Sequence, residues 1–111
     1  MAVEEKAQML SEAILESEEY QKYLAAEKLL KENQELFDRV NEYRKKNFLI
    51  QNGESVNKVE EIRKLTGEYH EMLNYKEVKD YLESELLLCR MMQKINRILM
   101  EKLEFDVSFI G

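Results

Sequence analysis

The stretch YKEVKDYLESELLLCRMMQKINRILMEKL, residues 75–103, is the most apolar long segment of the chain. Its apolar side chains return every three or four residues, which is the spacing of one face of an α-helix. Between Leu86 and Met100 they occupy most sides of the predicted helix, so a small monomer has few means of covering them. Two interpretations stay open: the other helices surround this one, or a second subunit covers it.

Capping residues divide the chain on either side of the loop at residues 52–55, where Gly53 can end one helix and Ser55 can cap the next. Ser17 and Asn33 are predicted caps nearer the N-terminus. Asn74 has the spacing of a capping box with Glu77. The pattern therefore predicts five helices, over residues 3–16, 18–31, 34–51, 55–73 and 75–103, with a kink or break near Gly67 in the fourth.

Composition supports an all-helical fold. The chain has 111 residues, with no proline and three glycines, and small β-rich domains need many more turn formers. We therefore expect an all-α antiparallel helical bundle, with one domain over residues 1–103. Beyond it, apolar and polar residues alternate with period two, which predicts an extended tail over 104–111. That tail is expected to dock in its own subunit, in a dimer mate or on a regulatory partner.

Charge and cysteine content exclude several classes of function. Lys and Arg total 17 against 23 Asp and Glu, and this net charge of −6 opposes binding to nucleic acid. The cluster Arg44-Lys45-Lys46 is the exception and leaves direct RNA binding as the alternative function. The single cysteine, Cys89, is expected to be buried and inert. The apolar run is too short and too charged to insert in a membrane, and acidic residues near the start oppose a secretory signal, so a cytoplasmic location is predicted.

No catalytic or metal-binding motif is found. A di-iron bundle needs Glu-x-x-His pairs, but the residue three before the single histidine, His70, is Gly67. Glu27 and Glu85 follow the same Tyr-Leu-x-x pattern and are interpreted as partly buried charges neutralised from neighbouring helices. We expect no enzyme activity, cofactor or metal. Residues 19–30 and 77–88 match at six of twelve positions, through either chance or an ancient duplication.

The segment Ser11–Leu30, the loop with Gly53, and Asn74–Leu88 followed by a long apolar helix resemble the YlbF/YmcA/YheA-like family. The markers run through most of the chain and are Ser17–Tyr20, Ala26, Glu27, Asn74, Val78, Tyr81, Leu82 and Glu85. The resemblance implies small helical cytoplasmic regulators of competence, biofilm formation and sporulation, commonly dimeric. It also implies a complex with a paralogue and a third protein that modulates RNase Y and mRNA processing. Cluster binding, seen in members with a cysteine-rich tail, is not carried over.

The sequence therefore predicts a non-catalytic regulatory adaptor that works through protein–protein interaction. Its expected partners are a second copy or a paralogue, within an RNase Y-associated complex. The candidate interface consists of apolar side chains on the last helix and the tail: Leu86, Leu87, Cys89, Met91, Met92, Ile98, Phe105, Val107, Phe109 and Ile110.

Overall fold

The computed structural model describes residues 2–103, and every regular element in that range is a helix. The all-α prediction is therefore confirmed. The helices are α1 (Val3–Leu15), α2 (Glu18–Lys31), α3 (Gln34–Gln51), α4 (Lys58–Glu68), α5 (His70–Leu73) and α6 (Lys76–Met100). The predicted tail over 104–111 lies outside the described residues.

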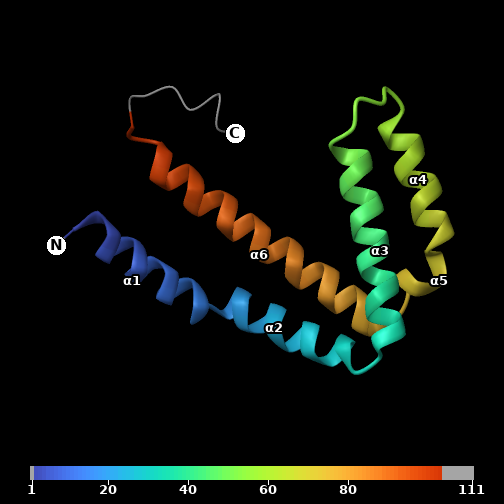
Figure 1. Ribbon diagram of the computed structural model, residues 1–111, viewed down its shortest axis with the longest axis horizontal. Helices are drawn as coiled ribbons and strands as arrows, with labels where there is room; N and C mark the ends of the chain where they lie inside the picture. The colour runs from blue at the N-terminus through green and yellow to red at the C-terminus, as the bar shows by residue number, and fades with distance from the viewer. Residues whose placement is uncertain (1, 104–111) are drawn as a thin grey trace.

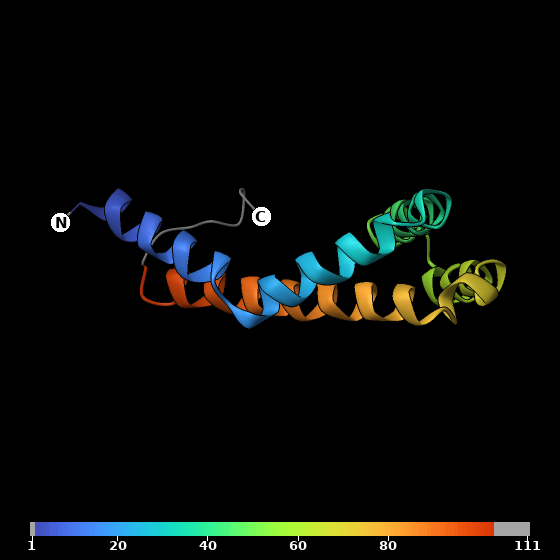
Figure 2. The same ribbon diagram turned by 90° about the horizontal axis from the view of Figure 1, so that it is seen from below.

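The molecule is an open, flat arrangement of two helix pairs (Figure 1). The helices α2 and α6 run antiparallel and side by side, and α3 with α4 forms a second hairpin at an angle to them. Seen from below, the chain is thin along its whole length (Figure 2). Its principal extents are 51 × 37 × 16 Å, so one or two layers of helices make up its thickness.

The core lies where the two helix pairs meet. Leu30 enters the core from the last turn of α2, Val40 from α3, and Val78 and Tyr81 from the first turns of α6. Each of these four side chains is 1% exposed or less. The remaining buried hydrophobic residues are Leu65, Tyr69 and Met72 from the α4–α5 segment.

Two of the predicted caps form and two do not. The Ser17 hydroxyl accepts a hydrogen bond from the Tyr20 amide at 3.2 Å, and the Asn33 side chain caps α3 in the same manner. Ser55 instead accepts a bond from the Asn57 amide inside the loop, and α4 begins three residues later than expected. The predicted capping box at Asn74 is wrong. The side-chain amide of Asn74 forms a hydrogen bond with the His70 ring, and α6 begins without a side-chain cap.

The fourth predicted helix is two helices. The break falls at Tyr69, two residues beyond Gly67, and separates α4 from the single turn of α5. Tyr69 has φ −106° and ψ 18°, which leaves the helical region and lets α5 turn back toward α6. The last helix also ends three residues earlier than predicted, at Met100.

The second half of α6 is not enclosed by the other helices. Leu86, Leu87 and Met92 are each more than 40% exposed, whereas the buried residues of α6 all precede residue 85. The radius of gyration is 17.4 Å, against about 13 Å for a compact domain of this length. Of the two interpretations for this helix, the one in which the other helices surround it is therefore wrong. Among residues 2–103, no helix combines the length and apolar character needed to cross a bilayer.

The two similar segments of the sequence face each other. Tyr23 of α2 and Tyr81 of α6 occupy equivalent positions in the matching segments, 58 residues apart. Their rings stack with centroids 5.5 Å apart, and their hydroxyls are 3.3 Å apart. The repeated pattern thus marks the contact between two antiparallel helices.

Candidate interaction surface

A small polar cluster fixes α2 and α3 against α6. The Arg44 guanidinium donates a hydrogen bond to the Tyr81 hydroxyl at 2.9 Å and forms an ion pair with Glu85. It also lies over the Tyr81 ring, 5.3 Å from the centroid. Since Glu85 is about three-quarters covered, Arg44 supplies the neutralising charge that was predicted to come from a neighbouring helix.

The equivalent carboxylate on α2 is balanced within its own helix. Glu27 accepts a hydrogen bond from the Tyr23 hydroxyl at 3.3 Å and pairs with Lys31 at 3.4 Å. The prediction of a cation from a neighbouring helix is therefore wrong for Glu27. Burial, more than its bonds to Tyr81, raises the pKa of Tyr23 far above its ordinary value of 10, so this hydroxyl stays protonated. Glu27 and Glu85 thus both serve as structural partners of neighbouring side chains.

A second cluster fixes α3 against the α4–α5 break. Tyr69 donates to Glu42 at 2.7 Å and accepts a bond from the Lys46 ammonium at 3.0 Å. The hydrogen bond from Tyr69, followed by the one from Lys46, lowers the pKa of Glu42 below its ordinary 4.5. Two members of the basic cluster Arg44-Lys45-Lys46 are consequently held in ion pairs with carboxylates of the same chain.

The single histidine and the single cysteine, His70 and Cys89, lie on different helices. Within residues 2–103, no group of three His, Cys, Asp or Glu side chains could hold a metal ion. His70 lies on α5, where it bonds the Asn74 amide at 3.3 Å. The prediction that Cys89 is buried is wrong, because this residue is exposed on the uncovered half of α6.

The predicted interface residues of α6 divide between two faces. Leu87, Met91 and Ile98 follow one another at intervals of four and seven residues and therefore share a face. Leu86, Cys89 and Met92 lie on the opposite side of the same helix. All six are exposed except Met91, which is half-buried, and Ile98 is 59% exposed. The predicted tail residues Phe105, Val107, Phe109 and Ile110 lie outside the described part of the chain.

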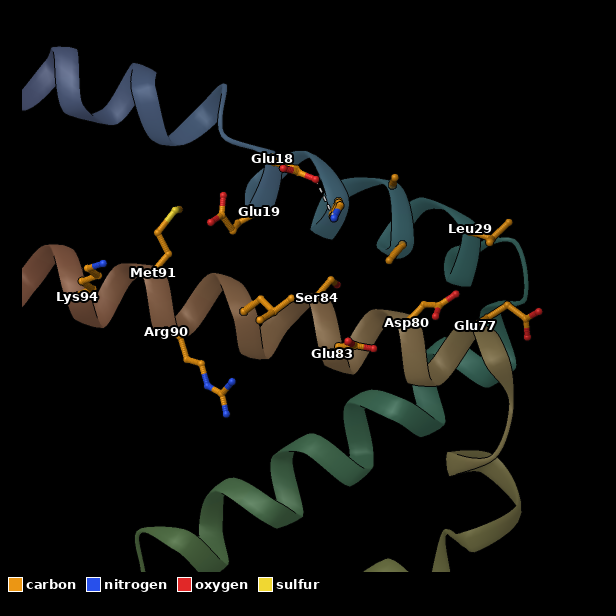
Figure 3. A pocket seen from close by; sticks show the side chains of 14 residues that line it. Glu18, Glu19, Leu29, Glu77, Asp80, Glu83, Ser84, Arg90, Met91 and Lys94 are labelled. Atoms are coloured by element: carbon orange, nitrogen blue, oxygen red, sulfur yellow. Dashed lines mark ion pairs between the residues drawn. The ribbon is translucent and has the colours of Figure 1, made fainter.

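The face of α6 that carries Leu87 forms a groove with α2 (Figure 3). Its volume is about 860 Å³. Small residues line its floor, namely Ala25 and Ala26 from α2 and the buried Ser84 from α6. Leu29, Leu87 and Met91 add apolar surface. Small side chains let a second backbone approach closely, so this shape suits a helix from another chain.

Charged residues are unevenly distributed along the groove. Glu77, Asp80 and Glu83 line it along the first half of α6, and Arg90 and Lys94 follow in the second half (Figure 3). On α2, Glu18 and Glu19 lie near the basic end, and Glu18 is neutralised by Lys22 at 2.8 Å. The α6 side of the groove is therefore acidic toward the helix start and basic toward its end.

Sequence reasoning missed the α2 side of this surface. No sequence pattern marks Ala25, Ala26 and Leu29 as the wall of a binding surface. In the sequence, Arg44 stands out only as a member of the basic cluster Arg44-Lys45-Lys46. The match between Tyr23 and Tyr81 was the one available indication that α2 and α6 pack together.

The fold and the surface define a class of protein, a small, flat, all-α chain. Polar contacts between side chains hold its helices at the core, and the second half of its last helix exposes apolar side chains. A family model described as "Control of competence regulator ComK, YlbF/YmcA" matches residues 3–104, which is nearly the whole chain. The protein therefore belongs to the YlbF/YmcA family, a family of regulators.

Two relatives show how far the sequence has diverged. The chain is 28% identical over 117 residues to a UPF0342 protein of Desulfitobacterium hafniense, a comparison that covers 100% of this chain and 91% of the relative. It is 24% identical over 106 residues to a UPF0342 protein of Caldicellulosiruptor bescii, covering 92% and 88% respectively. No solved structure matches the chain.

Proposed function

We propose that this protein is a non-catalytic cytoplasmic adaptor that regulates competence, and with it biofilm formation and sporulation, by binding other proteins. The observation that carries the proposal is the second half of α6, where most apolar side chains are exposed within the described part of the chain. Exposed apolar surface of this extent marks an association site in a protein of this size. The family match supports a regulatory role.

The expected partners are a second copy or a paralogue, in a complex associated with RNase Y. The chain exposes 9059 Å², whereas a compact chain of 13.3 kDa exposes about 6,500 Å². This excess of exposed surface favours an assembled state over a free monomer. The face of α6 with Leu86, Cys89 and Met92 is the proposed site for the heterologous partner.

The proposal is tested by affinity capture from the native cell. Leu86→Glu and Met92→Glu place a charge on exposed positions of the partner face without disturbing the core. We expect each variant to lose the paralogue and RNase Y from the captured proteins while its helical circular dichroism stays unchanged.

Val59→Glu is the matched control. Val59 is also apolar and is 77% exposed, but it lies on α4, away from the partner face. This control is expected to capture the same partners as wild type. Capture by Leu86→Glu and Met92→Glu equal to that of the control would refute the proposed partner face.

Direct RNA binding is the alternative function, and the basic cluster on α3 is its one motivating observation. The ion pairs of Arg44 with Glu85 and of Lys46 with Glu42 weaken this alternative, because they satisfy two of its three charges. A gel shift with cellular RNA distinguishes the two. A complex that forms at low salt and dissociates steeply as salt rises would favour RNA binding.

A further inference from the structure

We infer that the α2–α6 groove is the contact between two copies of this chain, with the two α6 helices antiparallel around a two-fold axis at Leu87. This inference rests on the proposed function as an association protein and adds which face binds a second copy, and in what register. The opposite face, with Cys89, stays available to a different partner.

The position of the axis follows from the spacing of charges on α6. Asp80 lies seven residues before Leu87 and Lys94 lies seven residues after it. Both line the groove with Leu87, and each is about 10.5 Å from it along the helix. A two-fold axis at Leu87 therefore places Asp80 of each copy opposite Lys94 of the other.

The same axis brings a second pair of opposite charges together, because Glu83 falls beside Arg90 of the second copy. Within residues 2–103, Arg90 and Lys94 take part in no ion pair, so both are available. Asp80 does pair with Lys76 of its own helix at 3.3 Å, an exposed pair that contributes little.

The charges on α6 also favour this orientation over the alternative one. A parallel pairing would set Asp80 against Asp80 and Lys94 against Lys94, and such like-charge contacts disfavour a wrong partner geometry. The antiparallel pairing is self-complementary, as a two-fold interface must be. The floor of Ala25, Ala26 and Ser84 gives the second α6 room to approach.

The axis is tested by cross-linking. Cys89→Ser removes the native thiol, and Leu87→Cys in that background places one thiol per chain at the proposed axis. Because a residue at a two-fold axis faces its own copy, a short bismaleimide is expected to link most of the protein into covalent dimers. The matched control is Val59→Cys in the same background, an exposed site on α4 that is expected to stay monomeric on denaturing gels.

The register is tested by charge reversal in sedimentation equilibrium. We expect Asp80→Lys and Lys94→Asp each to weaken the dimer by at least about tenfold, because each change acts twice across the axis. The double variant restores the opposite pairing and should recover affinity close to that of wild type. Lys64→Glu on α4 makes the same change in net charge as Lys94→Asp and should leave the dimer unchanged.

Three results would overturn the inference: a monomer at every concentration, a dimer that Leu87→Cys does not cross-link, or a double variant no better than the single ones. The outcome is separable from that of the proposed function. A dimer in another register leaves partner capture through Leu86 and Met92 intact, whereas failure of capture leaves the cross-linking result standing.

Discussion

Replacing Tyr81 tests the packing of α6 against α2 and α3 at the centre of the fold. This side chain is 1% exposed, stacks on Tyr23 and meets the Phe37 ring edge-on at a centroid distance of 6.2 Å. Its hydroxyl also accepts the Arg44 hydrogen bond at 2.9 Å. Two variants separate these roles: Tyr81→Phe removes only the hydroxyl, and Tyr81→Ala also removes the ring.

The magnitudes follow from what each change leaves behind. Tyr81→Phe deprives a charged donor of its acceptor in a half-buried site, which costs about 1–3 kcal/mol of unfolding free energy. Tyr81→Ala adds a cavity where an aromatic ring was packed, for a total of about 3–5 kcal/mol. A domain of this size has about 5–15 kcal/mol in all, so the alanine variant is expected to be partly unfolded near physiological temperature.

The assay is urea unfolding followed by circular dichroism at one fixed protein concentration. We expect the midpoint for Tyr81→Phe to fall by about 1 M, given the usual dependence on urea. Tyr75→Phe, at a site 52% exposed, is the control and should shift the free energy by less than about 0.5 kcal/mol. The packing role given to Tyr81 would be wrong if Tyr81→Phe behaved like that control and Tyr81→Ala lowered the free energy of unfolding by less than about 1 kcal/mol.

Three further predictions concern exposed or capping side chains. Cys89 should react with a thiol reagent at nearly the rate seen in denaturant, because it is exposed and does not line the groove. This rate should be the same in dilute and in concentrated protein, and strong protection in the native protein would contradict the placement of Cys89. Ser17→Ala should cost about 0.5–2 kcal/mol in urea unfolding, because the first-turn amide of Tyr20 loses its acceptor; an unchanged midpoint would show that the cap contributes nothing. The folded pKa of Glu42 is lowered, so its contribution to stability is present above pH 4.5 and is lost as the pH falls through that lowered pKa. Glu42→Gln should therefore flatten the decline in melting temperature under acid, and an identical decline in both proteins would refute this role.

Local sequence patterns predicted the helices well. The absence of proline and the spacing of apolar residues established an all-α chain, and Ser17 and Asn33 marked two helix starts through hydrogen bonds to the next turn. The late start of α4 and the missing side-chain cap of α6 have a common cause. Ser55 and Asn74 found other partners close by, and a sequence records only that a side chain can cap a helix.

The arrangement of the helices in space was harder to predict. An apolar α6 is compatible with burial inside a bundle or with exposure on a flat chain, since helical periodicity describes a face without naming what covers it. The groove was missed for the same reason, because Ala25 and Ala26 matter only through lining one groove together with Ser84 of α6. Arg44 is the partner of Glu85 because α3 lies against α6, and the sequence alone does not show that contact.

The first helix, α1, illustrates what a flat fold means for local order. None of its side chains is buried, its start has no side-chain cap, and it contains 13 residues. An isolated helix of this length is marginal in water, so we expect α1 to open and close more readily than the core. Its amide protons should exchange with solvent almost as fast as those of a free peptide, while the first turns of α6 exchange only when the whole chain unfolds. Any protein that binds α1 must offset the entropic cost of holding this segment helical. A contact at this end of the molecule is therefore expected to form fast and to be readily reversed.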